Sequence, residues 1–438
     1  MSDDTRTVLC NANLLDGENP AAPGSSVVIE GTRIRSVVRG DAAPAREGER
    51  RIDLGGRTLM PGMVQTHFHT GFGPAPSLTQ PPVLGLDAPP AYMGMVAAMN
   101  ARIALDSGVT SIIGSSNPAG LDPCLKDAMV LGVVEGPRML ACTHELMASG
   151  DMADGRNRSW FMDIRESGLT RPVDGVDEVR RAVREEVGRG CDVVKLSVSS
   201  GHGSRAADDL CYFTMDELLA ATDTAHERGA IVRAHCASRK AILMCARAGV
   251  DIIDHADRID DEGIEAVLKA DATVVPSMLW SFRYVAFADS WDHSQATFPI
   301  GEGFPETLEE TLARLEGVKR DLEYTCSMLP RMIDAGVRLT VGDDFGFPMM
   351  PHGAYVDEYE IYTRELGVAP LEVLRWATRN GGQAMQMGDE LGTVSEGRLA
   401  DLLVVDGDPS QQIGCLRDGI AAVMRDGRFV RDRAQLVG

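Results

Sequence analysis

The stretch Leu59-Met-Pro-Gly-Met-Val-Gln-Thr-His-Phe-His69 decides the fold that this sequence predicts. Met60-Pro61-Gly62-Met63 has the composition of a turn, and Val64 to Thr66 favours a short strand. Side chains at positions i and i+2 of a strand project to the same face. We therefore expect His67 and His69 to point together from a strand end, where two neutral imidazoles can bind one metal ion. The spacing alone does not establish a site, because a chain with nine histidines also contains such pairs by chance.

Beyond this stretch the sequence alternates between apolar strands and amphipathic helices. Helices are predicted from about Asp177 to Gly190, from Thr214 to Gly229, from Ser238 to Ala248 and from Glu262 to Lys269. The second helix begins with a capping box, because Glu217 stands three residues after Thr214. Repeated βα units predict a parallel sheet, and eight of them close a (β/α)8 TIM barrel of the α/β class. The candidate barrel strands begin near residues 62, 109, 138, 192, 230, 250, 273 and 337.

The two ends of the chain share a different pattern, in which short strands are separated by turns. The predicted strands are Val8 to Leu14, Ser26 to Glu30, Arg33 to Val38, Arg51 to Leu54, Gly392 to Val394, Leu399 to Val405, Ala421 to Arg425 and Arg428 to Val430. A chain of 438 residues is also longer than the ~250–300 residues that one core usually supports. We therefore expect residues 1–60 and 385–438 to form one small β-sandwich domain beside a barrel domain of residues 61–384.

Composition excludes several classes of function. A hydrophobic fraction of 44% and a charged fraction of 25% are typical of a soluble globular protein. The net charge of -22 disfavours binding to a phosphate backbone, so no nucleic-acid partner is expected. No apolar run approaches the ~20 residues of a membrane span, and Met1 to Asp4 does not begin a signal peptide. Nine scattered cysteines without a Cys-x-x-Cys pair indicate free thiols. We expect a cytoplasmic protein without a membrane partner.

Polar residues at the predicted strand ends carry the chemistry, because the active site of such a barrel lies at the carboxyl ends of its strands. In chain order these residues are His67, His69, Lys195, His235, His255 and the pair Asp343-Asp344.

Each of these residues also has a simpler interpretation. His235 or His255 would suit a hydrogen-bonded histidine of the core, and the acidic pair would suit a solvated turn. Lys195 lies among apolar residues, where a free ammonium is costly to bury, so it either reaches solvent or its charge is chemically altered. Four histidines, one lysine and one aspartate at the strand ends of a single barrel nevertheless favour a metal site.

The same residues carry a resemblance to a known family. The chain resembles the amidohydrolase superfamily of metal-dependent hydrolases, in its prolidase or imidazolonepropionase-like branch, over nearly its whole length. The matching stretches are Leu59 to His69, Val194 to Ser197, Phe213 to Cys236, Ala248 to His255 with Asp260 to Gly263, Gly342 to Asp344, and Glu396 to Asp406. The resemblance implies a distorted barrel beside a small β-sandwich built from both chain ends.

The resemblance also implies a ligand set for two divalent metal ions. His67, His69 and Asp344 would bind one ion, and His235 and His255 the other. Lys195 would bridge both ions as a carbamate formed with CO2. The ions would share a hydroxide whose pKa they lower, and one ion would polarise the scissile carbonyl. Asp344 would act as general base and then as general acid. Zn2+ is the expected metal, and Mn2+, Co2+ and Fe2+ also suit such ligands.

Three departures from the family pattern lie near these ligands. Asp343 replaces the usual small residue or threonine before the catalytic aspartate, and an adjacent carboxylate would raise the pKa of its neighbour or bind substrate. Ala237 stands where many relatives have a tyrosine. Ala256 follows His255, where a glycine is common. These departures affect the prediction of the substrate more than that of the metals.

The substrate is indicated by loops at the active face. Apolar and aromatic residues are rich from Gly71 to Met93, from Met278 to Phe287 and from Phe345 to Met350, which predicts a hydrophobic pocket with adaptable walls. Many of these residues would equally suit the core. His144 and His202 are candidate catalytic contacts to the oxyanion or the leaving group. Arg205, Arg258 and Arg283 are candidates for binding a carboxylate, although a surface role suits each of them.

Three functional hypotheses follow. The first is hydrolysis of an amide-like C–N bond, in an amide, carbamate, urea or lactam, of a small and fairly apolar molecule. The second is a dipeptidase or carboxypeptidase that acts on N-acyl or prolyl-type amino acids, which would need a cation for the terminal carboxylate. The third is a non-catalytic scaffold related to these enzymes. In each enzymatic case the partner is a small-molecule substrate, and a homo-oligomer is expected.

Overall fold

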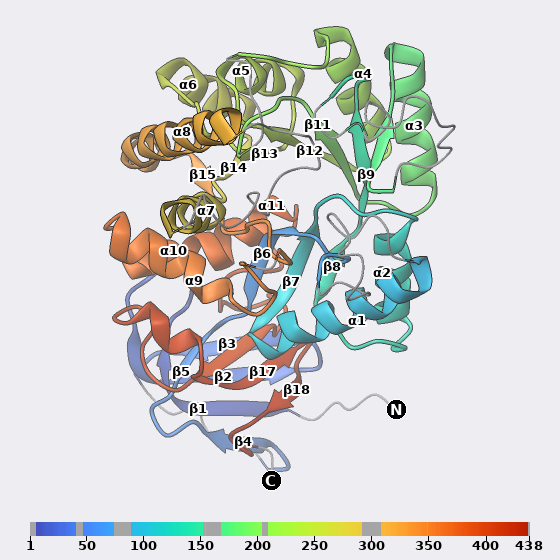
Figure 1. Cartoon of the computed structure of the whole chain (residues 1–438). Coiled ribbons are helices and arrows are strands. Elements are labelled where there is room, and N and C mark those ends of the chain that lie inside the picture. Colours follow the sequence, from blue (N-terminus) through green and yellow to red (C-terminus); the bar gives the residue numbers. More distant parts are fainter. Residues whose placement is uncertain are drawn as a thin grey trace.

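The computed structural model describes residues 6–40, 47–73, 89–151, 154, 168–203, 209–290, 308–347 and 349–436. A barrel surrounded by helices lies above a sheet that joins the blue and red ends of the chain (Figure 1). Among the described helices, none is both long and apolar enough to span a bilayer. All nine cysteines lie in the described ranges and are free thiols, as predicted.

Eight successive strands form the barrel and confirm the predicted α/β fold. They are β6 (Met63–Phe68), β7 (Val109–Gly114), the divided strand β8 (Arg138–Leu140) and β9 (Cys142–Met147), β11 (Val193–Ser197), β12 (Ile231–Cys236), β13 (Ile252–His255), β14 (Thr273–Val275) and β15 (Arg338–Leu339). β8 pairs in parallel with β7, and β9 with β11. The barrel closes where the Thr66 backbone N–H donates to the Val341 carbonyl at 3.1 Å. Each predicted strand start lies within two residues of the observed one.

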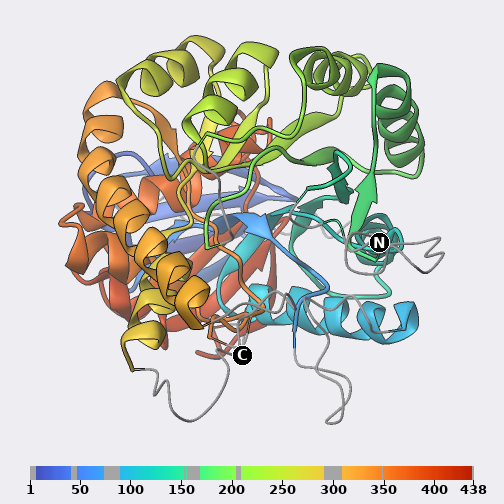
Figure 2. The ribbon, with the colours of Figure 1, turned by 45° about the horizontal axis from the view of Figure 1, so that its top comes forward.

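Helices pack around the outside of the strands (Figure 2). They are α1 (Pro90–Asp106), α2 (Leu121–Val130), α3 (Val176–Gly188), α4 (Met215–His226), α5 (Arg239–Ala248), α6 (Asp261–Ala270), α7 (Met278–Ser290), α8 (Leu308–Ala335), α9 (Tyr355–Glu360), α10 (Pro370–Arg375), α11 (Gly381–Ala384), the π-helices η2 (Ile361–Glu365) and η3 (Trp376–Asn380), and the 3-10 helix η4 (Ile413–Leu416). The capping box of α4 is confirmed, because Thr214 Oγ1 accepts from the Glu217 N–H and Glu217 Oε2 accepts from the Thr214 N–H.

Strands from both chain ends form one eight-stranded sheet. They are β1 (Thr7–Leu14), β2 (Ala22–Glu30), β3 (Arg33–Val38), β4 (Arg50–Asp53), β5 (Thr58–Pro61), β16 (Leu402–Val405), β17 (Ile420–Arg425) and β18 (Arg428–Asp432). β5 joins the two ends, since it pairs with β1 on one side and with β16 on the other. Leu9, Leu59 and Leu402 share one buried apolar cluster. A separate short strand, β10 (Thr170–Pro172), extends the barrel sheet beside β9.

Two details of the sheet differ from the prediction. Thr58–Pro61 is the strand β5, although Pro61 indicated a turn. Proline is tolerated there because it is the last residue of the strand, and the following Gly62 N–H donates to the Asp401 carbonyl. Residues 392–394 form no strand, because Val394 donates to the Asp16 carbonyl in an irregular connection.

Candidate metal centre

The predicted ligands lie at the carboxyl ends of the barrel strands. They are His67 and His69 at the end of β6, Lys195 in β11, His235 in β12, His255 at the end of β13, and Asp344 after β15. A close contact between the first and last strands brings Asp344 to the histidines. A Cβ atom on Gly342 would lie only 2.4 Å from the backbone nitrogen of His67, so only glycine allows this approach.

His67, His69 and Asp344 point their ligand atoms at a common centre. Asp344 Oδ1 lies 3.0 Å from His67 Nε2 and 3.3 Å from His69 Nε2, and the two Nε2 atoms are 3.1 Å apart. A tetrahedral ion with bonds of about 2.0–2.1 Å separates its ligand atoms by about 3.3 Å. The spacing of these three atoms therefore fits a bound metal ion.

Hydrogen bonds fix the tautomer of His69. Its Nδ1 lies 3.1 Å from the Ser116 carbonyl, so Nδ1–H donates and the lone pair of Nε2 is left for a metal. The imidazole also stacks on Phe72, with ring centroids 4.0 Å apart and planes 3° apart. The ring is therefore held in the orientation that a ligand needs.

His235 and His255 form the second half of the site. His255 ends β13 with a backbone φ of +71°, and this left-handed turn leaves its ring beside His235, with the two centroids 4.6 Å apart. Nε2 of His235 and Nδ1 of His255 are buried and have no hydrogen-bond partner among the described residues. A buried polar atom without a partner is costly unless a ligand satisfies it, so these nitrogens suit a metal ion.

Burial keeps these imidazoles neutral. It lowers the pKa of His69 to about 4 and that of His235 to about 3, and it lowers the pKa of His255 well below its ordinary range. Only the neutral imidazole can bind a metal ion. The metal-free protein therefore already holds these three side chains in the protonation state that binding requires.

The two adjacent aspartates differ in environment. Burial would raise the pKa of Asp344, but His67 and His69 hold it well below its usual range. Burial and the charge of Asp344 raise the pKa of Asp343 to about 7. The oxygens of Asp343 accept from the backbone N–H groups of Trp280, at 3.1 Å, and of Asp344, at 2.7 Å. Asp344 is thus the carboxylate that faces the histidines, and Asp343 supports the loop.

Lys195 does not reach solvent, because it is only 2% exposed. Its Nζ lies 2.7 Å from Asp254 Oδ2. Asp254 is itself fully buried and is paired with the fully buried Arg233. Of the two sequence-based interpretations of Lys195, solvent exposure is therefore wrong.

His202 lies beside the second half of the site. It is 8% exposed, its ring stacks on His255 with centroids 3.8 Å apart, and its Nδ1 lies 3.2 Å from Asp257 Oδ1. Its buried Nε2 has no hydrogen-bond partner in the part of the chain that the structure describes. Burial opposes protonation, but Asp257 raises the pKa of His202 to about 9. Although His202, His255 and Asp344 are close enough to share an ion, a protonated His202 is better suited to donate a hydrogen bond.

The structure does not bring His144 into this group. Its Nδ1 lies 3.1 Å from Glu186 Oε1 on α3, and its Nε2 accepts from the Ala119 N–H. The reason is strand parity: the neighbouring Thr143 receives a hydrogen bond from the backbone of Lys195, so His144 projects from the other face of β9. This position does not support the predicted catalytic contact, and we leave His144 out of the proposed site.

Sequence interpretation missed four charged residues near the ligands, namely Glu145, Arg233, Asp254 and Asp257. Arg233 stands two residues before His235 in an apolar strand, so strand periodicity could have placed it on the ligand face. Glu145 is 9% exposed and pairs in register with Lys195. Burial raises the pKa of Glu145, although Lys195 opposes the shift.

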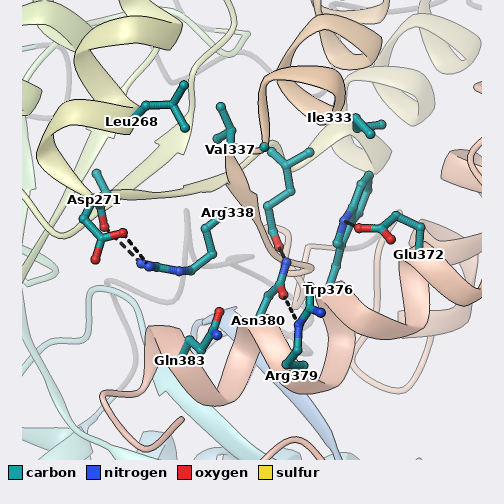
Figure 3. Close-up of a pocket in the computed structure, with 13 residues that line it drawn as sticks. Leu268, Asp271, Ile333, Val337, Arg338, Glu372, Trp376, Arg379, Asn380 and Gln383 are labelled. Carbon is teal, nitrogen blue, oxygen red and sulfur yellow. Dashed lines mark hydrogen bonds and ion pairs between the residues drawn. The ribbon is translucent and has the colours of Figure 1, made fainter. Parts of the chain in front are cut away.

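The predicted hydrophobic pocket is only partly described. Residues 74–88 of the first loop, Arg205 and Pro348 lie outside the described residues. In the other loops, Leu279, Trp280 and Phe345 are buried in the core, whereas Phe347 is half-buried against Phe72. A cavity of about 310 Å³ lies instead at the opposite end of the barrel, where β14 and β15 begin (Figure 3).

Comparison with known proteins is consistent with this geometry. The model of the amidohydrolase family matches residues 58–430. A crystal structure of an amidohydrolase is 30% identical and superposes with a TM-score of 0.81 over 98% of this chain and 99% of its own. A Xaa-Pro dipeptidase with bound methionine is 25% identical, with a TM-score of 0.82 over 98% of this chain and 100% of its own. Ochratoxinase from Aspergillus niger is 25% identical over 389 residues, which are 85% of this chain and 75% of that protein.

Proposed function

Because this chain belongs to the amidohydrolase family, we propose that it is a binuclear metal-dependent hydrolase that cleaves an amide-like C–N bond. The observation that carries the proposal is the group of buried imidazole nitrogens near Asp344 that have no hydrogen-bond partner within the described ranges. Neutral imidazoles and a carboxylate are good ligands for a divalent cation and have no comparable use in a scaffold.

The proposed ligand set follows the two halves of the site. His67, His69 and Asp344 would hold one ion, and His235 and His255 the other. Lys195 would bridge them after its neutral amine adds CO2 and releases a proton, and the carbamate would keep one N–H to donate to Asp254. Two divalent ions, most simply Zn2+, would supply Lewis acidity and would lower the pKa of a bound water.

Asp344 and His202 would move or hold protons around the scissile bond. Asp344 is ionised and faces the histidines, so it can accept a proton from the attacking water and return it to the leaving nitrogen. The Nε2–H of His202 would donate to the substrate carbonyl or leaving group, while Asp257 holds the other ring nitrogen. Ala237 packs against the loop that carries His202: a Cβ atom on Gly201 would lie 2.5 Å from the Ala237 Cβ, so this close contact requires glycine at position 201.

A small, fairly apolar substrate is the first candidate. A dipeptide or N-acyl amino acid needs a cation for its carboxylate, and two of the predicted cations are already paired: Arg258 with Asp321 at 2.9 Å and Arg283 with Asp357 at 2.5 Å. The dipeptidase alternative remains a second proposal, because a Xaa-Pro dipeptidase is among the similar structures.

A hydrolysis screen of metal-reconstituted protein tests both proposals. The panel sets aryl amides, carbamates, ureas and lactams against Xaa-Pro dipeptides and N-acyl amino acids. We expect turnover in the first group, dependent on bound metal and lost in His67→Ala. His226→Ala is the matched control, because His226 is an exposed histidine on α4 that pairs with Asp251. Less than one equivalent of metal and no hydrolysis by any preparation would favour the scaffold instead.

A further inference from the structure

Arg233 is a fully buried arginine inside the barrel, and its guanidinium donates to two backbone carbonyls and one carboxylate. Its Nη1 donates to the backbone carbonyls of Thr66, at 2.8 Å, and Gly114, at 2.9 Å. Its Nε and Nη2 donate to the two carboxylate oxygens of Asp254, at 3.1 and 2.5 Å. The Arg233 guanidinium therefore binds both oxygens of the Asp254 carboxylate and connects it to the ends of β6 and β7.

Asp254 passes this constraint to two proposed ligands. Its Oδ2 also accepts from Lys195 Nζ at 2.7 Å, and its Oδ1 lies 3.4 Å from His67 Nδ1. Asp254 thus accepts a hydrogen bond from Lys195 and lies within ion-pair distance of the His67 imidazole.

This arrangement links five of the eight barrel strands, since the bonds reach β6, β7, β11, β12 and β13. Stability alone is a weak explanation for it. A buried ion pair is often no more stabilising than apolar side chains of the same volume, because desolvation offsets the attraction. Its position, in contact with His67 of the first half of the ligand set and with the proposed bridge Lys195, points to an effect on the metal centre.

We propose that Arg233 and Asp254 form a positioning pair that orients His67 and Lys195 for metal binding. The inference rests on the proposed function. Asp254 selects the His67 tautomer that keeps its proton on Nδ1, which leaves Nε2 free as a ligand, and it holds the Lys195 nitrogen in place by one N–H bond. Arg233 acts only through Asp254, by fixing the plane of the carboxylate.

Metal affinity of the full-length, metal-free protein tests the pair without reference to turnover. Zn2+ and Co2+ are titrated in competition with a chromogenic chelator into wild type, Asp254→Asn, Arg233→Met and the double variant. We expect each single variant to bind ~10–100-fold more weakly, the range for groups that support metal ligands. Because both residues act on the same ligands, the double variant should be no weaker than the worse single variant. Arg233→Lys, which cannot make the paired contact, should not restore affinity.

Asp401→Asn is the matched control. Asp401 is 5% exposed and pairs with Arg138 at 3.3 Å, near the start of β6 rather than its end. It should lose stability without losing metal affinity. Circular dichroism at the titration temperature selects variants that are folded, and Asp254→Glu, which keeps the charge, serves if Asp254→Asn does not fold.

The outcomes separate this inference from the proposed function. Folded Asp254 and Arg233 variants with wild-type affinity would overturn the positioning pair while leaving the metal site intact. Additive losses in the double variant would overturn the claim that Arg233 acts through Asp254. A wild-type protein that binds no metal would overturn the proposed function first.

Discussion

The polar groups that line the amino-end cavity and the histidines at the carboxyl end of the barrel differ in whether the protein itself supplies their hydrogen-bond partners. At the amino end, the cavity of about 310 Å³ is bordered by polar side chains that are bound to the protein itself (Figure 3). Arg338 pairs with Asp271 at 2.6 Å, Asn380 donates to the Leu339 carbonyl at 2.8 Å, and Trp376 donates to Glu372 at 3.1 Å.

At the carboxyl end, buried nitrogens of His202, His235 and His255 have no hydrogen-bond partner among the residues that the structure describes. Leaving such atoms unsatisfied costs about 1–3 kcal/mol each, which folding alone would not favour. The cavity at the amino end therefore does not mark the functional end of the barrel. Buried ligand atoms without a protein partner are the better indicator.

Removing a proposed ligand should have the largest effect. His67→Ala deletes Nε2, which lies 3.0 Å from Asp344 Oδ1, and leaves the first ion with three of its four proposed protein ligands. We expect a fall in hydrolysis of more than ~100-fold, above the upper range for supporting groups, together with loss of at least one equivalent of metal. Metal analysis and initial rates measure the two effects. Full metal content in this variant would contradict the assignment of His67.

Replacing His202 should have a smaller effect, because it is proposed to touch the substrate and not the metals. His202→Asn removes the proton donor at Nε2, and we expect kcat to fall by ~10²-fold or more, within the range for a single positioned acid or base. Metal content should stay at the wild-type level. A variant that loses metal in proportion to activity would instead make His202 a ligand.

Strand periodicity explains why much of the ligand set could be predicted. His67 and His69, like Lys195 and His235, lie in or just after short apolar strands, and a barrel brings all such strand ends to one rim. The same periodicity also shows the limit of the method. His144 occupies a plausible position along the chain, but its side chain projects from the other face of β9.

Contacts between distant strands could not be predicted from the sequence. Arg233 reaches Thr66 and Gly114 only because the barrel closes, and no local pattern records that closure. The left-handed backbone of His255 had no sequence signal either, since β-strand periodicity would place Asp254 and His255 on opposite faces. Sequence thus predicts which strand ends carry chemistry, whereas the network beneath them requires the structure.

Acid should destabilise the carboxyl end, where neutral histidines are buried. Burial lowers the pKa of His352 to about 3, while its Nε2–H donates to the His69 carbonyl at 3.1 Å. The unfolded chain takes up a proton near pH 6.5 that the folded chain refuses, so this contribution to stability is complete above pH 6.5 and is lost as the pH falls toward 3.

His352→Gln should therefore reduce the pH dependence of the free energy of unfolding of the metal-free protein between pH 6.5 and pH 4. The reduction should correspond to at most one bound proton. Urea unfolding at several pH values measures that slope. Arg338→Gln is the control for the slope, because the described residues that line the amino-end cavity include no histidine. An unchanged slope in His352→Gln would mean that His352 takes up its proton at the same pH in the folded and the unfolded chain.

The smallest effect is expected at the amino end, and it provides the strictest test of the contrast. Arg338→Gln breaks an ion pair with Asp271, whose side chain is 84% exposed, so the loss of stability should be only about 0.2–1 kcal/mol. Metal content and hydrolysis should be unchanged, because the cavity lies where β14 and β15 begin and the ligands lie at the other rim. Thermal unfolding and kcat/KM measure both quantities. Altered metal binding or turnover in Arg338→Gln would show that polar groups bonded within the protein do not mark a purely structural end of the barrel. The cavity would then be part of the functional site.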